Sequence, residues 1–161
     1  MGLKVFDFME KNVYSLKSDH TVREALYFML EKNVSGLPIT DDSNKLIGFV
    51  TDDDFMKYLF NLGNKRNFLF ASTLSEMSEK NLEEIVKLKD VLGDELVIHL
   101  AKKNPIYVFE MEDYDEACRL LQNKKIRKLP VINQEGKLVG VVSRSIILKY
   151  LIKYAQKTEL F

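Results

Sequence analysis

Cysteine, histidine and tryptophan are almost missing from this chain of 161 residues, which has one cysteine, two histidines and no tryptophan. The single Cys118 excludes a disulfide framework and a cysteine-rich zinc site. His20 and His99 lie far apart in the sequence and suggest no metal pair. No serine–histidine–aspartate or cysteine–histidine arrangement follows from one cysteine and two distant histidines, and we identify no paired-carboxylate arrangement. We therefore expect no catalytic residues, no resident metal and no enzymatic activity.

Charge of one sign and long apolar runs are also lacking. Lys plus Arg and Asp plus Glu number 24 each, so no overall basic field exists to attract nucleic acid or an anionic membrane. No apolar run approaches the ~20 residues that span a bilayer, and the segment 1–6 lacks a signal peptide's apolar core. We expect a cytoplasmic protein that neither inserts into membranes nor binds nucleic acid.

Glycine and proline are scarce, with seven and three residues, whereas 46% of the residues are hydrophobic. This composition excludes disorder and low complexity. A chain of this size buries roughly 70% of the surface that its unfolded form exposes. The length therefore suits one ordinary domain, or two small ones that share a core.

An internal repeat organises the sequence. Placing residue n over residue n + 92 aligns 12–60 with 104–152 without a gap, with 13 identities in 49 positions. The identities include Glu24-Ala25 with Glu116-Ala117, Leu37-Pro38 with Leu129-Pro130, Gly48 with Gly140, and Lys57-Tyr58-Leu59 with Lys149-Tyr150-Leu151. Other positions exchange similar residues, such as Ile39 with Val131, Ile47 with Val139 and Thr51 with Ser143, so we treat the duplication as real.

Each copy shows the same order of expected elements. In the first copy a short extended piece at 14–16 precedes a helix that Thr21 opens, with Glu24 completing a capping box. The strands 37–39 and 46–50 flank a turn at 41–44, and Thr51 caps a second helix. The second copy repeats this order with a turn at 133–136. The predicted fold class is α+β, with the unit β-α-β-β-α occurring twice.

The repeat divides the chain into a first copy at 1–62, a partly helical connector at 63–103, and a second copy at 104–161. The connector includes an expected helix from Asn81 and a further helical stretch from Glu95 to Lys102. A unit of about 50 residues has too little interior to be stable alone. We expect the copies to pack with pseudo-twofold symmetry and to leave clefts for small ligands.

Three short runs recur in the same order in both copies. In the first copy they are Asp19-x-Thr21-Val22-x-Glu24-Ala25, Val34-Ser35-Gly36-Leu37-Pro38-Ile39, and Leu46-x-Gly48-x-Val50-Thr51-x-x-Asp54. In the second they are Glu116-Ala117, Ile126-Arg127-Lys128-Leu129-Pro130-Val131, and Leu138-Val139-Gly140-Val141-Val142-Ser143. This ordered set resembles the CBS domain, named for cystathionine β-synthase, whose tandem pair is called a Bateman module. The resemblance implies binding of adenine nucleotides or related ligands and signalling to an effector.

The resemblance points to Thr51 and Asp54 as the hydroxyl and carboxylate that hold the ligand's ribose. One ionised carboxylate can accept hydrogen bonds from both hydroxyls of a ribose diol. The same Thr-x-x-Asp spacing is also a plain helix cap, and the two roles are compatible. In the second copy Ser143 keeps the hydroxyl, but Ile146 stands where the carboxylate would be. We therefore expect one good nucleotide site per chain.

By the same resemblance, basic residues of the second copy would meet the phosphates, and these are Arg127 and Lys128, with Arg144 as a weaker candidate. Their first-copy counterparts Ser35 and Gly36 carry no charge. The alternative is that Arg127 and Lys128 form a solvated helix end favoured by the helix dipole. The adenine would lie against the piece that begins the copy and against the strand before the ribose carboxylate, at Val13, Tyr14, Ser15, Phe49 and Val50.

The leading hypothesis is a regulatory module that binds AMP, ADP, ATP or a related adenosyl ligand between the two copies and signals to an unknown effector protein. A homodimer through the paired repeats is expected from the resemblance. Two alternatives remain open: an interaction or scaffold module that binds no nucleotide, and a module in which Asp52, Asp53 and Asp54 take Mg²⁺, alone or with ATP.

Overall fold

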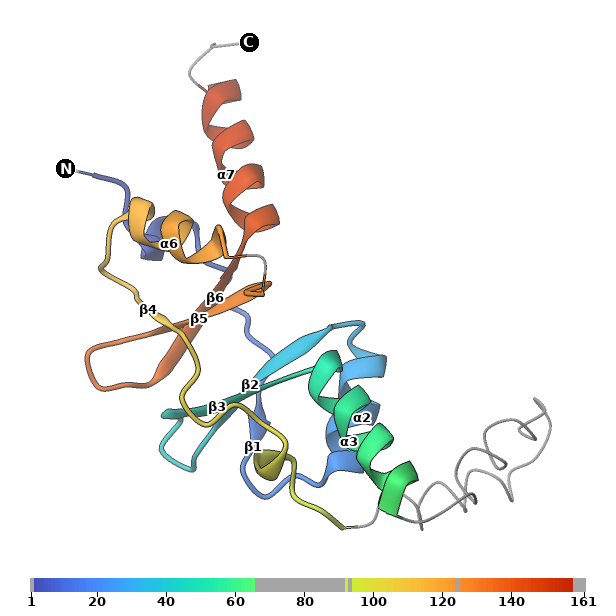
Figure 1. Cartoon of the computed structure of the whole chain (residues 1–161). Helices are drawn as coiled ribbons and strands as arrows, with labels where there is room; N and C mark the ends of the chain where they lie inside the picture. The colour runs from blue at the N-terminus through green and yellow to red at the C-terminus, as the bar shows by residue number, and fades with distance from the viewer. Residues whose placement is uncertain (1, 66–91, 93, 124, 158–161) are drawn as a thin grey trace. The chain divides into compact units, whose positions relative to one another are not determined.

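The computed structural model describes residues 2–65, 92, 94–123 and 125–157 (Figure 1). The chain forms two compact units. Unit 1 draws its residues from Met1–Ser15, Thr40–Ile47 and Asn104–Phe161, and unit 2 draws its residues from Leu16–Ile39 and Gly48–Lys103. Each unit therefore combines segments that are distant in the sequence.

The first repeat contributes a three-stranded sheet in the order β1-β2-β3 and two helices. Its elements are β1 (Leu16–Lys17), α2 (Val22–Glu31), β2 (Gly36–Thr40), β3 (Leu46–Thr51) and α3 (Asp52–Lys65). A short 3₁₀ helix, η1 (Val97–His99), belongs to the same unit 2. The order β-α-β-β-α predicted for this copy is confirmed.

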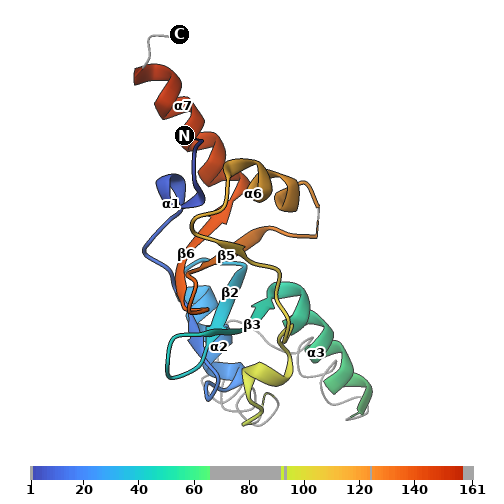
Figure 2. The ribbon, with the colours of Figure 1, turned by 90° about the vertical axis from the view of Figure 1, so that its left-hand side faces the viewer.

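The second repeat has the same element order and the sheet order β4-β5-β6. Its elements are β4 (Val108–Phe109), α6 (Tyr114–Leu121), β5 (Lys128–Ile132), β6 (Leu138–Ser143) and α7 (Arg144–Lys157). Unit 1 also holds α1 (Val5–Phe8), which Figure 2 labels. Strand β4 runs parallel to β5, and β5 runs antiparallel to β6 with Lys128 opposite Ser143. The α+β fold class and its duplication are confirmed.

Local sequence signals explain where α2 begins. Thr21 has extended backbone angles, and its hydroxyl accepts a hydrogen bond from the Glu24 amide at 3.2 Å. The Glu24 carboxylate in turn accepts from the Thr21 amide at 2.8 Å. These two bonds satisfy backbone N–H groups that the first helical turn leaves without partners. The predicted capping box is confirmed.

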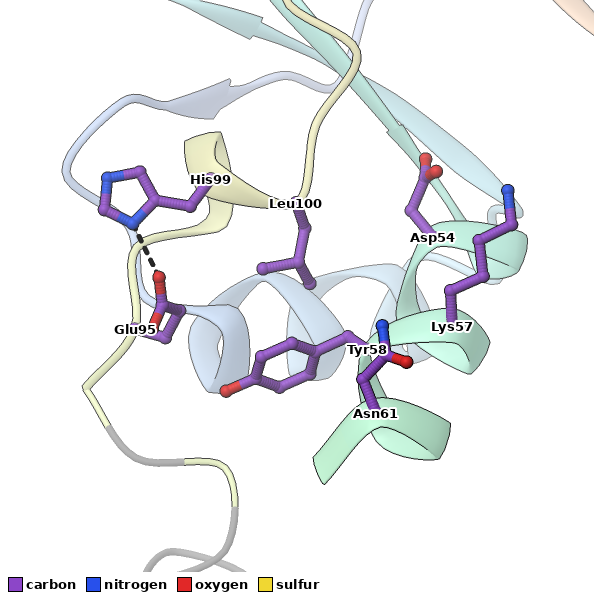
Figure 3. Close-up of a pocket in the computed structure, with 7 residues that line it drawn as sticks. All are labelled: Asp54, Lys57, Tyr58, Asn61, Glu95, His99 and Leu100. Carbon is purple, nitrogen blue, oxygen red and sulfur yellow. Dashed lines mark hydrogen bonds and ion pairs between the residues drawn. The ribbon is translucent and has the colours of Figure 1, made fainter. Parts of the chain in front are cut away.

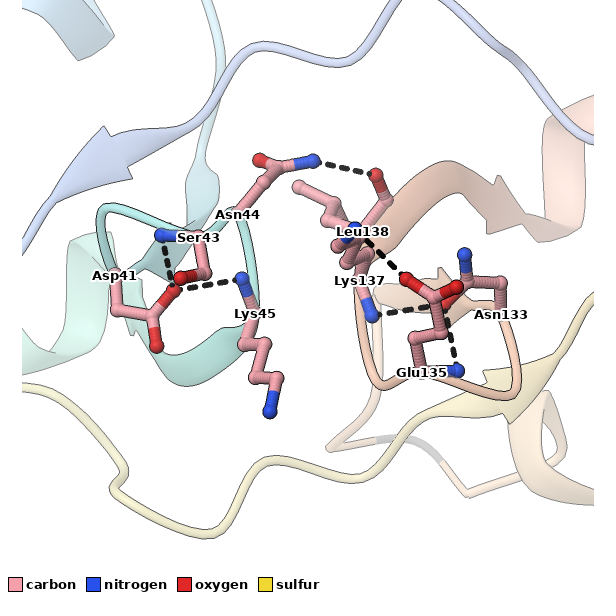
Figure 4. Close-up of polar contacts among 8 residues, drawn as sticks. All are labelled: Asp41, Ser43, Asn44, Lys45, Asn133, Glu135, Lys137 and Leu138. Carbon is pink, nitrogen blue, oxygen red and sulfur yellow. Dashed lines mark hydrogen bonds and ion pairs between the residues drawn. The ribbon is translucent and has the colours of Figure 1, made fainter.

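The two hairpin turns are built alike, and Figure 4 shows their contacts. Asp41 Oδ1 accepts from the amides of Ser43 and Lys45, both at 2.9 Å. Asn133 Oδ1 accepts from the amides of Glu135 and Lys137, both at 3.0 Å. The last turn residue has a positive φ in both, 64° at Asn44 and 79° at Gly136. Asparagine and glycine are the residues that tolerate this conformation best.

The hairpin tips also pair with each other inside unit 1. The Leu46 amide donates to the Gly136 carbonyl at 3.1 Å, and the Leu138 amide donates to the Asn44 carbonyl at 3.0 Å. The Asn44 side-chain amide adds a bond to the Leu138 carbonyl at 3.0 Å. This pairing explains why residues 40–47 of the first repeat belong to unit 1.

The segment before each repeat joins the unit that contains the other repeat's helices. Glu10, from before the first repeat, exchanges two backbone hydrogen bonds with Val141 of β6, both at 3.0 Å. Lys102, from before the second repeat, exchanges two with Phe49 of β3, at 2.9 and 3.1 Å. Both pairs follow the offset of 92 residues. The compact units therefore cut across the sequence division into 1–62, 63–103 and 104–161.

A close backbone approach accompanies each exchange. A Cβ atom added to Gly140 would lie 2.5 Å from Met9 Sδ and 3.2 Å from the Glu10 carbonyl oxygen. A Cβ atom added to Gly48 would lie 3.1 Å from Ile98 Cδ1. Because glycine has no side chain, the segment before each repeat can approach the strand that contains Gly140 or Gly48 closely.

The core of each unit comes from the predicted apolar positions. In unit 1, α1, α6, α7 and the sheet bury Val5, Phe8, Val108, Ala117, Leu121, Leu129, Val131, Val142 and Ile147. In unit 2 the fully buried positions include Val22, Ala25, Leu37, Ile39, Val50 and Val97. Burial of these side chains supplies the main favourable free energy of folding.

Most of the predicted connector, including the helix expected from Asn81, lies outside the described residues. The helical stretch expected from Glu95 to Lys102 is shorter in the structure, where only Val97–His99 form a 3₁₀ helix. Lys102 is extended instead, because its backbone pairs with Phe49. Within the part of the chain that the structure describes, no helix has the length and apolar character needed to cross a membrane.

Candidate functional site

The start of α3 carries the predicted ribose-binding pair. The Thr51 amide and hydroxyl both donate to Asp54 Oδ2, each at 2.9 Å. The carboxylate therefore caps the helix, as the plainer interpretation of this spacing requires. Among the described residues, Asp54 Oδ1 takes part in no hydrogen bond. One carboxylate oxygen thus serves the fold while the other can accept from a ligand.

Asp54 also lines a hollow of about 360 Å³ inside unit 2, which Figure 3 shows. One wall is a stripe of α3 at helical spacing, formed by Asp54, Lys57, Tyr58 and Asn61. The other wall comes from η1 and its flanks, with Glu95, His99 and Leu100. The Tyr58 hydroxyl donates to the Leu92 carbonyl at 3.1 Å, and this bond orients the Tyr58 ring.

The hollow offers both charges and an apolar surface. His99 Nδ1 lies 2.6 Å from Glu95 Oε1, so the imidazole is oriented along one side (Figure 3). Lys57 adds an ammonium group, Asn61 an amide, and Leu100 an apolar contact. Such a mixed lining suits a polar organic ligand with a ring. Sequence reasoning missed Lys57, Asn61 and His99. The helical spacing of residues 54, 57, 58 and 61 could have shown that these side chains share one face of α3. No local sequence pattern could have shown that η1 packs beside that face.

The two predicted phosphate-binding residues lie at the start of β5 in unit 1. Arg127 is exposed, and Lys128 is partly buried opposite Ser143. Burial lowers the pKa of the Lys128 ammonium below its ordinary value, because desolvation disfavours the charged form. In the described part of the chain, no carboxylate pairs with this ammonium group. A partly desolvated cation of this kind is suited to an anionic ligand.

The Arg144 side chain is bonded to two backbone carbonyls. Its Nε donates to the Leu121 carbonyl at 2.8 Å, and its Nη2 donates to the Asn123 carbonyl at 3.0 Å. The guanidinium therefore contacts the carboxyl end of α6. Its direct contact with phosphate stays a prediction.

The second copy lacks the carboxylate, as its sequence states. The Ser143 hydroxyl lies 2.9 Å from the Ser145 hydroxyl and accepts from the Ile146 amide at 3.4 Å. The Ile146 side chain packs against the core of unit 1. This position supports the fold and offers no acceptor for a ribose.

The residues predicted to contact adenine differ in exposure. In unit 1, Tyr14 is 50% exposed, whereas Val13 and Ser15 are half-buried. In unit 2, the Phe49 ring covers Gly36, where an added Cβ would lie 2.9 Å from Phe49 Cε1. Val50 is fully buried in the core, so its side chain can support a ligand only from behind. The structure leaves these adenine contacts as predictions.

No group of three or more His, Cys, Asp or Glu side chains within the described ranges could hold a metal ion. The first turn of α3 carries Asp52, Asp53 and Asp54, and these three carboxylates do not form such a group.

Comparison with known proteins decides the family. The CBS domain profile matches residues 5–61 and 97–153, so the two matched segments are offset by the same 92 positions as the repeat. The chain belongs to the CBS domain family. The resemblance inferred from the repeated runs is confirmed.

Relatives of this CBS pair extend over nearly its whole length. The chain is 31% identical over 160 residues to the chloroplastic CBS domain-containing protein CBSX2 of Arabidopsis thaliana, covering 98% of this chain and 67% of the relative. It is 30% identical to CBSX1 of the same plant, of which it spans 62%. A CBS domain-containing protein of Dictyostelium discoideum is 29% identical, and the match covers 95% of this chain and 94% of that protein.

Solved structures agree with the fold. The crystal structure of CBSX2 in complex with AMP superposes with a TM-score of 0.70 at 30% identity, covering 95% of this chain and 98% of the other. A second CBSX2 crystal structure gives a TM-score of 0.73 at 28% identity, with coverage of 97% and 99%. The CBS pair is therefore confirmed in both sequence and architecture.

Proposed function

We propose that this CBS pair is a regulatory module that binds an adenine nucleotide. The observation that carries the proposal is the Asp54 carboxylate, which caps α3 with one oxygen and lines the hollow of unit 2 with the other available to a ligand. CBSX2, a relative at 30% identity, has been crystallised with AMP, and this supports AMP as the first nucleotide to test.

In this proposal Thr51 and Asp54 bind the ribose. A ribose diol would donate hydrogen bonds to the carboxylate, and such charge-assisted bonds contribute roughly 1.5–3 kcal/mol each. The geometry requires no rearrangement of the cap, because Thr51 uses only Oδ2. The ribose role and the capping role therefore operate together.

Arg127 and Lys128 bind the phosphate in this proposal. Lys128 supports this assignment, because its ammonium group is partly desolvated at the start of β5 and has no carboxylate partner among the described residues. A phosphate would restore the charge stabilisation that burial removes. Adenosine, which has no phosphate, should therefore bind more weakly than AMP.

Thermal unfolding with AMP tests the proposal. A ligand at ~100 times its dissociation constant stabilises a protein by about 2.7 kcal/mol, which corresponds to roughly 5–10 °C for a chain of this size. We expect this increase for the wild type and its loss in Asp54→Ala. Asp53→Ala is the matched control, because Asp53 is an exposed carboxylate in the same helical turn.

The outcomes separate the alternatives. An AMP-induced shift that persists in Asp54→Ala would place the nucleotide elsewhere on the chain. The absence of a shift with AMP, ADP, ATP and S-adenosylmethionine, with and without Mg²⁺, would favour an interaction module that binds no nucleotide.

We also propose that the protein forms a homodimer through the last helix of each repeat. These helices expose large apolar side chains at equivalent positions, Met56 (65%) and Phe60 (69%) on α3, and Leu148 (59%) and Ile152 (56%) on α7. Because the same apolar pair occurs twice in one chain, two copies can contact each other symmetrically. Sedimentation of Ile152→Glu and Phe60→Glu should show monomers, and an unchanged mass would exclude these faces.

The effector that responds to nucleotide binding is a second protein in this proposal. The cytoplasm is the expected compartment.

A further inference from the structure

The carboxyl ends of the two equivalent helices α2 and α6 are held in different ways. In unit 2, Asn33 adopts a positive φ of 51°, and the Val34 amide donates to the Met29 carbonyl at 3.0 Å. This is a backbone C-cap, in which a residue in the left-handed region turns the chain back onto the helix. The segment that follows α2 is therefore held by its own backbone.

Among the described residues of unit 1, the amide equivalent to that of Val34 belongs to Ile126, and it donates to the Asn123 carbonyl instead. The carbonyl equivalent to that of Met29 belongs to Leu121, and it accepts its hydrogen bond from Arg144 Nε at 2.8 Å. The position equivalent to Arg144 in the first repeat is Asp52, whose carboxylate has no hydrogen to donate to a carbonyl. The arginine cap is therefore possible only in the second repeat.

Arg144 also contacts the turn that leads into β5. Its Nη2 donates to the Asn123 carbonyl at 3.0 Å, and the same carbonyl accepts from the Ile126 amide at 2.9 Å. The Asn123 side chain accepts from the Lys125 amide at 3.0 Å. Arg144 thus binds Asn123, whose backbone carbonyl and side chain also accept hydrogen bonds from the amides of Ile126 and Lys125.

This turn ends at the cations assigned to the phosphate. Ile126 packs on the core and is followed directly by Arg127 and Lys128. Lys128 lies opposite Ser143, the residue before Arg144, in the β5–β6 ladder. The start of β5 is therefore held by the ladder, while the guanidinium holds the Asn123 carbonyl, to which the Ile126 amide just before β5 is also bonded.

We infer that Arg144 is a positioning residue for the phosphate-binding cations, acting through the Leu121 and Asn123 carbonyls. The inference rests on the proposed function for the ligand, and it replaces the direct phosphate contact predicted for Arg144 from the sequence. The fork of the guanidinium is what allows one side chain to reach two carbonyls, and a lysine ammonium lacks this geometry.

The test compares AMP with adenosine in Arg144→Lys and Arg144→Gln by calorimetric titration. Both variants should weaken AMP binding by about tenfold, equivalent to about 1.4 kcal/mol, and should leave adenosine binding within about twofold of the wild type. Asn123→Ala should have the same effect, because it loosens the same turn without changing the charge at residue 144. Thermal unfolding of each variant confirms that it is folded.

Hydrogen exchange without ligand provides a second measurement. In both Arg144 variants the amide of Ile126 should exchange faster than in the wild type, whereas the amides of the 133–137 turn should exchange at the same rate. Unchanged exchange at Ile126 would show that Arg144 does not hold this turn.

Other outcomes are equally decisive. An Arg144→Lys variant with wild-type affinity for AMP, beside a weakened Arg144→Gln variant, would show that the charge itself contacts phosphate and would overturn the inference. Equal loss of AMP and adenosine binding would show a general structural role and would also overturn it. A wild type that binds neither ligand refutes the proposed function and with it this role, while the exchange experiment still reports whether the cap exists.

Discussion

Replacing Gly140 by alanine tests the exchange of segments between the repeats. The new methyl group would lie 2.5 Å from Met9 Sδ, 3.0 Å from Met9 Cγ and 3.2 Å from the Glu10 carbonyl oxygen. Met9 is only 8% exposed, so its thioether cannot swing freely into solvent. The Glu10 backbone is held to Val141 by two hydrogen bonds of 3.0 Å and cannot retreat without lengthening them.

Overpacking of this kind costs about 1–3 kcal/mol. For a chain of this size each kcal/mol changes the melting temperature by roughly 2–4 °C, so Gly140→Ala should melt about 2–12 °C below the wild type. Urea unfolding followed by circular dichroism gives the free energy of unfolding directly. Gly48→Ala is the matched variant in the other unit, where the nearest atom to the new methyl group is Ile98 Cδ1 at 3.1 Å.

We therefore expect Gly140→Ala to destabilise the protein more than Gly48→Ala does. We also expect the cost of Gly140→Ala to fall in a Met9→Ala background, because the closest contact is then removed. The reasoning is refuted if Gly140→Ala leaves the melting temperature unchanged, or if its cost does not depend on the side chain at residue 9.

Two further predictions concern pH. Burial lowers the pKa of the Lys128 ammonium group, so the charge of this group opposes folding at neutral pH. The wild type therefore gains stability as the pH rises from the lowered pKa of the folded state to the ordinary pKa of a lysine in the unfolded chain. Lys128→Met should be more stable than the wild type at pH 7, by a margin that narrows at alkaline pH, and should bind AMP more weakly; a less stable variant at pH 7 would contradict this. Hydrogen bonds from the Thr21 amide and hydroxyl lower the pKa of Glu24, so this cap stabilises the fold above the carboxyl's ordinary pKa and is lost as pH falls through the lowered one. In urea unfolding, Thr21→Ala should cost roughly 0.5–2 kcal/mol at pH 7 and less at pH 2, where the bond from the Thr21 hydroxyl to the Glu24 carboxylate is already lost but the bond from the Glu24 amide to the hydroxyl remains. An equal cost at both pH values would show that the carboxylate is not involved.

Local features of this protein could be predicted from the sequence because their causes lie within a few residues. The Thr21–Glu24 cap, the turns at Asp41 and Asn133, and the apolar positions of the helices each depend on side chains next to one another in the chain. The duplication was equally visible, since it is a property of the sequence itself. The hydroxyl and carboxylate at the start of α3 followed from the family resemblance together with this local cap.

Contacts between distant residues could not be predicted in this way. The sequence places a glycine at residue 140, but it does not show that Met9 and Glu10 lie against this residue in the fold. The same is true of His99 beside α3 and of Arg144 at the end of α6. Thus the sequence alone determined the repeat, its elements and their caps. The tertiary structure decided that the segment before each repeat pairs with a strand of the other repeat's unit, and that Arg144 contacts the end of α6. Such long-range contacts depend on how whole elements pack, so they leave no periodic signal in the sequence.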